Sequence, residues 1–256
     1  MSIFKFILRA SNALLNFIVI LFLCTAGAYS VYALLDNQHI YAVAKNVQED
    51  MLQLKPDIEN TEDIKASFKE LLSINPDVCA WITMDGTKID FPVVQGKTNL
   101  TYINTNVYGE FSLAGSIFLD SRSDNKFLDS YSLIYGHHMV DSNMFDDLEL
   151  YKEEDFFNDN KSGNLILPDG GYDLEIYAYL NVTASEDMIF ETEQIQSNID
   201  KHLNYVEQNA IYLHKDAFEK AKKADAQILA LTTCSSEFTD ARTIILAVME
   251  PHKPAE

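Results

Sequence analysis

The sequence predicts a mainly β domain of eight strands with helical connections, preceded by a transmembrane helix and an N-terminal helical segment. Three observations predict it: a long uncharged apolar run near the N-terminus, a charged stretch with helical periodicity, and then short apolar runs separated by turn residues. Eight strands with few helices between them are typical of an antiparallel or mixed β-barrel or sandwich.

The apolar run over residues 13–35 contains 23 residues without a charge, which is enough for a helix to cross the hydrocarbon core of a membrane. Lys5 and Arg9 precede the run and acidic residues follow it, so the positive-inside rule places residues 1–12 in the cytoplasm and the rest outside. A cleaved signal peptide is the alternative, but the apolar region of such a peptide is shorter. We therefore expect a retained, single-pass anchor.

Residues 36–75 read as an extracellular helical stalk or docking segment, because apolar residues from Ile64 to Leu72 recur at helical spacing. Pro56 interrupts the helical run that comes before it. Strand-like runs follow, so the main domain is predicted to span residues 76–256.

Each predicted strand is a short apolar run bounded by turn residues. The eight runs are Cys79–Met84, Ile89–Gln95, Ser116–Asp120, Ser132–Tyr135, Leu165–Leu167, Tyr172–Val182, Gln227–Thr233 and Arg242–Val248. Asp85-Gly86 and Pro168–Gly171 are turn signals that predict hairpins. Helical patterns cover Met144–Phe157 and Glu191–Lys223.

The chain is strongly acidic, with 19 Lys and Arg residues against 39 Asp and Glu residues and a net charge of −20. Nucleic acid is therefore excluded as an expected partner, because binding to a phosphate backbone depends on clustered basic residues. Three cysteines are too few for a disulfide framework. The count still allows one Cys79–Cys234 bridge, buried structural thiols or one reactive thiol.

A candidate nucleophile is Cys234, which ends the apolar run Leu229–Thr233 and precedes a polar stretch. Arg242 opens the next predicted strand, so two strands joined by a short loop would bring the two residues together. A guanidinium there would lower the thiol pKa and hold a developing oxyanion. The alternative is a buried structural cysteine beside a loop arginine.

A candidate proton carrier lies in Gly136-His137-His138, where another β run ends. Gly136 is expected to let the backbone turn, and strand alternation directs only one of the two rings into a site. No spacing typical of a zinc site accompanies the pair, so no metal is expected. The other histidines, among them His202, are expected at the surface.

Together these elements resemble the class B sortases, the membrane-anchored cysteine transpeptidases of Gram-positive bacteria. The TLxTC-type signature of that family appears as Leu231-Thr-Thr-Cys234, with Ala230 where the family commonly has Thr. Its arginine follows at Arg242, and its Gly-His element is Gly136-His137.

The resemblance spans essentially the whole domain, continuing in Trp81–Gln95, Gly115–Asp120 and Tyr135–Phe145. The short Cys-to-Arg loop and the helical insertion over Glu191–Lys223 favour class B over the other classes. The second histidine after the glycine is a departure from the family pattern that removes no catalytic group.

The resemblance implies an eight-stranded sortase-type β-barrel that cleaves a C-terminal sorting signal of secreted proteins and passes the acyl group to an amine. It implies Cys234 as the nucleophile, His137 as the proton donor and acceptor, and Arg242 as the oxyanion or substrate contact. The implied partners are the sorting-signal peptide and an amine acceptor, either a peptidoglycan cross-bridge or a pilin lysine. The implied chemistry requires no cofactor.

Two readings compete with the transpeptidase. A non-enzymatic, anchored binding domain would explain the anchor and the strands but not the convergence of the candidate residues. A hydrolytic cysteine peptidase would use the same residues with water as acceptor. Calcium is a further alternative, but Asp120, Asp124 and Asp129 lack EF-hand spacing and are expected to form a solvated acidic face.

Overall fold

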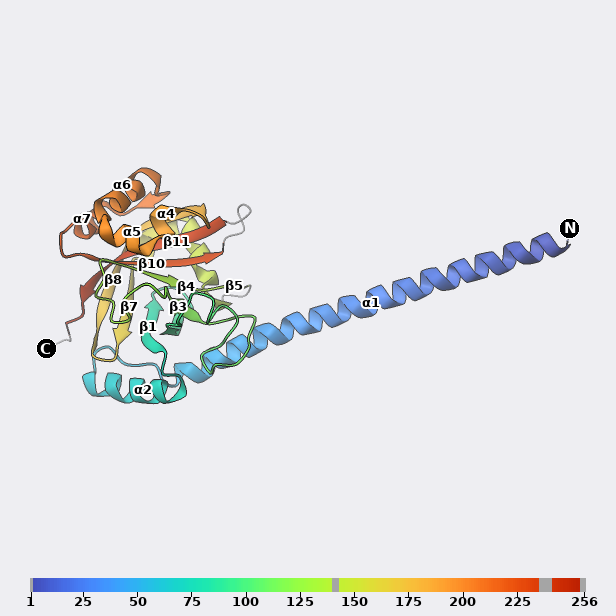
Figure 1. Cartoon of the computed structure of the whole chain (residues 1–256), viewed down its shortest axis with the longest axis horizontal. Coiled ribbons are helices and arrows are strands. Elements are labelled where there is room, and N and C mark those ends of the chain that lie inside the picture. Colours follow the sequence, from blue (N-terminus) through green and yellow to red (C-terminus); the bar gives the residue numbers. More distant parts are fainter. Residues whose placement is uncertain (1, 140–142, 235–240, 254–256) are drawn as a thin grey trace. The chain divides into compact units, whose positions relative to one another are not determined.

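The computed structural model describes residues 2–139, 143–234 and 241–253, and the chain forms two compact units, Met1–Ala42 and Val43–Glu256 (Figure 1). The first unit is the larger part of the helix α1 (Ser2–Leu52). This helix contains an 18-residue window with a mean hydropathy of 2.2, and none of that window is buried. An exposed apolar helix of this length is consistent with membrane anchoring.

The second unit contains the end of α1 and all the remaining elements. Its helices are α2 (Thr61–Ile74), the 3₁₀ helix η1 (Asp146–Lys152), α3 (Glu154–Asp159), α4 (Asp187–Phe190), α5 (Thr192–Ser197), α6 (Ile199–Asn209) and α7 (Lys215–Ala221). Its strands are β1 (Val78–Met84), β2 (Asp90–Val94), β3 (Ile117–Leu119), β4 (Tyr131–Tyr135), β5 (His138–Met139), β6 (Asn143–Met144), β7 (Ser162–Leu167), β8 (Gly170–Thr183), β9 (Tyr212–Leu213), β10 (Gln227–Cys234) and β11 (Ala241–Pro251).

Eight strands form a closed barrel, which confirms the predicted fold class. Their hydrogen-bonded order is β11-β10-β4-β3-β2-β1-β7-β8, and β8 pairs with β11 to close the ring. The pairs β2–β3 and β4–β10 are parallel, whereas the other neighbours are antiparallel, so the barrel is mixed. Closure leaves no free sheet edge among these eight strands.

The local signals of the sequence account for the turns and helix starts. Gly86, in the turn between β1 and β2, has a φ of 74°, which glycine adopts without the penalty other residues pay. Asn198 begins α6, where its side chain accepts a hydrogen bond from the Lys201 amide. The single helical region predicted over 191–223 is therefore divided into α5, α6 and α7.

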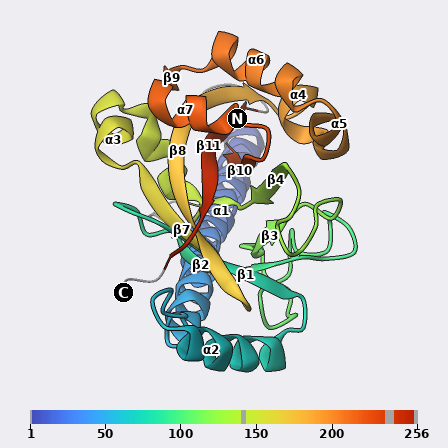
Figure 2. The same ribbon diagram turned by 90° about the vertical axis from the view of Figure 1, so that its left-hand side faces the viewer.

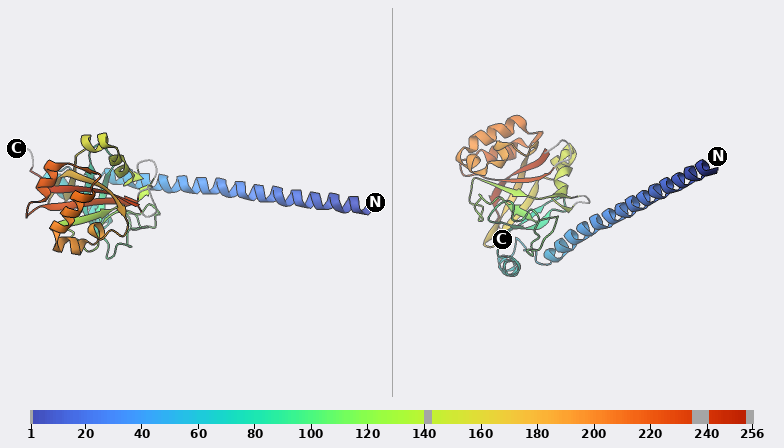
Figure 3. Two further views of the ribbon diagram at one scale, coloured as in Figure 1. Left: turned by 90° about the horizontal axis from the view of Figure 1, so that it is seen from above. Right: turned by 45° about the vertical axis from the view of Figure 1, so that its right-hand side comes forward.

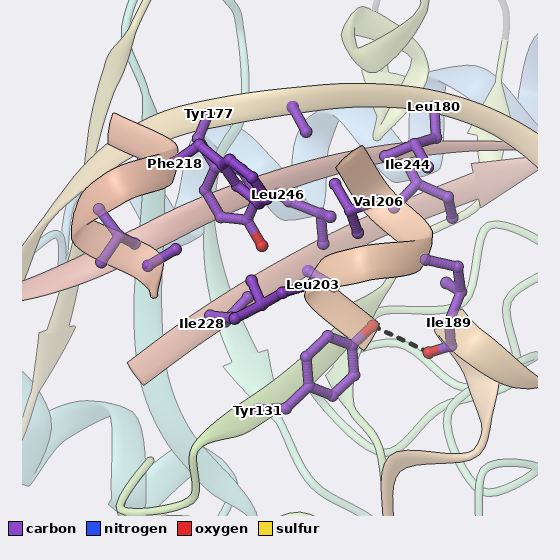
Figure 4. Packing of buried hydrophobic residues seen from close by; sticks show 14 of the residues in the cluster. Tyr131, Tyr177, Leu180, Ile189, Leu203, Val206, Phe218, Ile228, Ile244 and Leu246 are labelled. Carbon is purple, nitrogen blue, oxygen red and sulfur yellow. Dashed lines mark hydrogen bonds between the residues drawn. The ribbon is translucent and has the colours of Figure 1, made fainter. Parts of the chain in front are cut away.

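The barrel strands are buried on both faces, which explains why they read as continuous apolar runs. One outer face packs against α2 and the end of α1, through residues such as Phe68, Leu71 and Trp81. Another outer face, on β4, β8, β10 and β11, packs against α4–α7 (Figure 4). In that second cluster the Tyr131 hydroxyl donates to the Ile189 carbonyl at 2.8 Å and so joins β4 to α4.

The helices cover different sides of the barrel. Helices α4–α7 lie at one end of the domain and α2 lies at the opposite end (Figure 2). The segment η1–α3 lies on another flank, away from α4–α6 (Figure 3). The insertion α4–α7 packs against β4, β8, β10 and β11, the strands next to the candidate residues.

Two sequence-based expectations about burial are wrong. His202 is completely buried, not exposed, because α6 turns it toward the barrel with Leu203 and Val206. Asp120 is also completely buried and pairs with Arg122 at 2.9 Å, so it does not belong to a solvated acidic face.

Candidate active site

The candidate residues lie where three neighbouring strands end. Strand β10 pairs antiparallel with β11, and this register places Cys234 opposite Arg242. Strand β10 also runs parallel to β4, where Thr232 is opposite Tyr135, and the Gly136 amide donates to the Thr232 carbonyl at 3.1 Å. The side chain of Cys234 and the predicted loop Ser235–Asp240 lie outside the described part of the chain.

Strand alternation identifies the face of the barrel on which the site opens. Ile228 and Ala230 of β10, like Ile244 and Leu246 of β11, belong to the cluster covered by the insertion α4–α7. Two residues further toward the strand ends, the side chain of Arg242 falls on this same outer face. The site therefore lies on the same outer face as α4–α7, beside α4, whose Phe190 lines it.

A groove of about 310 Å³ lies on this face. Its apolar wall is formed by Leu100, Ile103, Phe118 and Phe190, and Tyr135 stacks on Phe118 with ring centroids 5.1 Å apart. Its polar lining includes Asn99, His137, Thr232, Thr233 and Arg242. An apolar groove with a few converging polar side chains is typical of a ligand-binding site.

The structure separates the two histidines of the Gly-His-His element. His137 lines the groove, and its Nε2 lies 2.6 Å from the Ile103 carbonyl oxygen. Because a carbonyl only accepts, Nε2 carries the hydrogen and Nδ1 is the nitrogen able to take a proton. His138 belongs to β5, where its Nδ1 lies 2.8 Å from Asp146 Oδ1.

Gly136 is required for a different reason from the one predicted. A Cβ atom at this position would lie 2.5 Å from Phe145 Cγ and 2.6 Å from Ile117 Cδ1, although the backbone conformation is not a left-handed one. The glycine therefore provides space for two side chains packed beneath the turn, rather than freedom for the backbone.

The remaining sequence candidates differ in environment. Arg242 Nη1 donates to the Ala241 carbonyl at 2.9 Å, and the side chain lines the groove. Cys79 is a free thiol in β1, so the Cys79–Cys234 bridge is absent. Burial raises the pKa of the Cys79 thiol to about 12, and a neutral buried thiol is a poor nucleophile.

A polar network behind the groove was not anticipated from the sequence. Burial acts to raise the pKa of Asp120, but hydrogen bonds from Arg122 and Asn99 outweigh it and lower that pKa overall. Burial and the neighbouring Asp120 carboxylate raise the pKa of Tyr135, so its hydroxyl stays protonated. Asn99 and Tyr135 lie 21 and 15 residues from Asp120 in the chain, so no local pattern predicts these two contacts.

A strand that ends in a cysteine opposite an arginine, beside a groove lined by a histidine, defines a thiol-dependent acyl transferase on a closed β-barrel. Listeria monocytogenes sortase B is 33% identical to this chain over 176 residues, which cover 68% of this chain and 70% of that protein. No protein-family model matches the chain.

Solved structures similar in fold to this chain belong to the same family as this relative. A class B sortase of Streptococcus pyogenes involved in pilus biogenesis has a TM-score of 0.66 and 37% identity, over 72% of this chain and 97% of that one. A mutant form of Clostridium perfringens sortase B has a TM-score of 0.71 and 32% identity, over 79% and 96%. A Staphylococcus aureus sortase B–substrate complex has a TM-score of 0.65 and 27% identity, over 83% and 95%.

The chain belongs to the class B sortase family, and its activity class is that of the cysteine transpeptidases.

Proposed function

We propose that this sortase cleaves a C-terminal sorting-signal peptide of secreted proteins through a thioacyl intermediate on Cys234 and transfers the acyl group to an amine. The observation that carries the proposal is the register that sets Cys234 opposite Arg242, beside the groove that His137 lines. The peptide assignment is supported by the substrate complex of the Staphylococcus aureus relative.

The chemistry follows from three groups. The Cys234 thiol gives its proton to His137 as its sulfur attacks the scissile carbonyl carbon, and the carbonyl electron pair moves to oxygen to form a tetrahedral oxyanion. When the C–N bond breaks, His137 gives its proton to the leaving amine and the acyl group stays on sulfur as a thioester. An incoming amine then attacks the thioester and the C–S bond breaks. His137 takes the proton from that amine and returns it to the sulfur, so the thiol is restored and the acyl group leaves as an amide.

Arg242 holds the developing negative charge on the carbonyl oxygen. Its planar guanidinium carries donors in a fixed fork and is always charged, so it can contact the oxyanion and a second substrate oxygen together. The net charge of −20 further attracts cationic amine acceptors to the protein.

The apolar helix anchors the enzyme, with residues 1–12 in the cytoplasm, residues 13–35 in the membrane and the barrel of residues 76–256 outside. The basic residues before the apolar run support this orientation. The acceptor is an amine of a peptidoglycan cross-bridge or of a pilin lysine. The second is supported by the identity of 37% to the sortase of Streptococcus pyogenes involved in pilus biogenesis.

The test uses the full chain in detergent micelles with a library of pentapeptides. Cleavage should be slow when water is the only acceptor and faster when an amine is added. The product should then be the N-terminal part of the peptide joined to that amine. A glycine peptide and a lysine-containing pilin peptide compare the two acceptors. Cys79→Ala is the matched control and should keep activity, whereas Cys234→Ala should lose it. If the acyl group is always transferred to water even when an amine is added, the protein is instead a hydrolytic peptidase.

A further inference from the structure

A buried ion pair lies behind the groove. Asp120, which directly follows β3, is completely buried, and Arg122 donates to both of its carboxylate oxygens through Nε and Nη2, each at 2.9 Å. This two-point contact fixes the guanidinium plane relative to the carboxylate. The pair is thus a rigid structure at the end of the barrel, set back from the groove lining.

The ion pair is bonded to three separate walls of the groove. Asp120 Oδ2 accepts hydrogen bonds from the Tyr135 hydroxyl at 3.0 Å and from Asn99 Nδ2 at 2.8 Å. Arg122 Nη2 donates to the Phe190 carbonyl at 2.6 Å. Asn99, Tyr135 and Phe190 line the groove and come from the β2–β3 connection, from β4 and from α4.

The contact with α4 is reinforced from the outside. Arg122 Nη1 lies 3.1 Å from Glu191 Oε2, so one guanidinium binds the buried carboxylate, a main-chain carbonyl and a surface carboxylate. The Phe190 ring faces Tyr135, with ring centroids 6.4 Å apart. The position of α4 relative to β4 therefore determines how far apart these two ligand-facing rings lie.

We propose that Arg122 is a positioning residue, which holds the Phe190 wall against the Tyr135 and Asn99 walls and so determines the affinity and selectivity of the groove for its peptide. This inference rests on the proposed function in taking a peptide as the ligand of the groove. It adds a group that touches neither substrate nor the reacting atoms.

The sharpest substitution is Arg122→Lys. It keeps a positive charge beside the buried Asp120, but an ammonium is a single point that cannot bind both carboxylate oxygens, the Phe190 carbonyl and Glu191 together. The expected loss in peptide affinity is about tenfold, the factor for one lost charge-assisted hydrogen bond. Selectivity between the preferred peptide and its single-residue variants should fall as well.

The measurement uses the full-length Cys234→Ala chain in detergent, where binding is separated from chemistry. The probe is a fluorescein-labelled pentapeptide selected by binding to this chain from a random library, and Kd is measured by fluorescence anisotropy. Lys55→Met is the matched control, because Lys55 is another half-exposed cation that binds a carboxylate, Asp90, at 2.7 Å. That control should keep Kd within about twofold.

A second variant guards against misfolding of Arg122→Lys. Glu191→Gln changes only the surface partner, whose side chain is 42% exposed, and should weaken binding by about twofold to threefold. In chains that retain Cys234, a small thiol reagent should modify Cys234 at the same rate in Arg122→Lys as in the wild type.

Unchanged Kd and selectivity in both variants would overturn the inference. So would an equal loss in Lys55→Met, or a fall in thiol-reagent reactivity that parallels the loss of peptide binding. Failure of the wild-type chain to form a thioacyl intermediate would instead count against the proposed function, while a weaker Kd in Arg122→Lys would still support the positioning role.

Discussion

Replacing Gly136 by alanine should damage both stability and activity, because the added methyl group has no space. Its carbon would lie 2.5 Å from Phe145 Cγ, 2.6 Å from Ile117 Cδ1 and 2.7 Å from Phe145 Cδ2, all well inside van der Waals contact. Phe145 is completely buried and Ile117 nearly so, which prevents either side chain from moving into solvent.

The expected cost follows from overpacking of a closed core. Inserting a methyl group into such a site costs about 1–3 kcal/mol. In a domain of this size, each kcal/mol lowers Tm by about 2–4 °C. Because His137 directly follows Gly136, a backbone shift that relieves the clash also displaces the ring, and we expect peptide cleavage to fall by at least about tenfold.

Two assays test this prediction: thermal unfolding monitored by circular dichroism, and the rate of peptide cleavage by the full chain. Gly109→Ala is the control: its φ of 81° makes alanine strained, yet the new Cβ would meet no described atom within 4 Å. That variant should lose Tm but keep activity. Combining Gly136→Ala with Ile117→Val, which removes the clashing Cδ1, should recover part of the loss. A wild-type Tm and rate in Gly136→Ala would refute the reasoning.

Three further predictions concern single side chains. His137→Ala should reduce transfer by orders of magnitude and His138→Ala far less, measured as amine-dependent product formation; the reverse order would assign the proton transfers to His138. Arg242→Lys should lose much of the single-turnover acylation rate, on the order of 10²-fold, and a near-wild-type rate would exclude a two-oxygen contact. Burial lowers the pKa of His202 from 6.5 to about 4. Between these two pH values the unfolded chain therefore takes up a proton at His202 that the folded chain does not. Stability should therefore fall by up to about 3 kcal/mol as pH drops from 6.5 to 4, and urea unfolding should show a flatter pH profile in His202→Gln; equal profiles would contradict this assignment.

The barrel was predictable because its strands carry strong local signals. Each strand is an apolar run between turn residues, and the turn at Gly86 lies where the sequence places it. The pairing of β8 with β11, which closes the barrel, joins segments far apart in the chain. Propensity and periodicity do not report such pairings, so the choice between barrel and sandwich came from the family resemblance.

The site was predictable only in part. A cysteine that ends one strand and an arginine that begins the next must lie close together if the strands pair, and the register agrees with this. The contact between Arg122 and the Phe190 carbonyl joins residues 68 apart, and no pattern in either segment predicts it. His202 is a different case. Its helical spacing places it on the same face as the apolar Leu203, and its predicted position at the surface rested on its polarity alone.

The central claim is that Cys234 carries the acyl group. Intact-mass spectrometry of the full chain, incubated with a cleavable sorting peptide in the absence of an amine, tests it most directly. The account predicts an added mass equal to the peptide N-terminal fragment, located at Cys234, absent in Cys234→Ala and released as the amide when an amine is added. An adduct on Cys79, or cleavage without any covalent intermediate, would contradict the account.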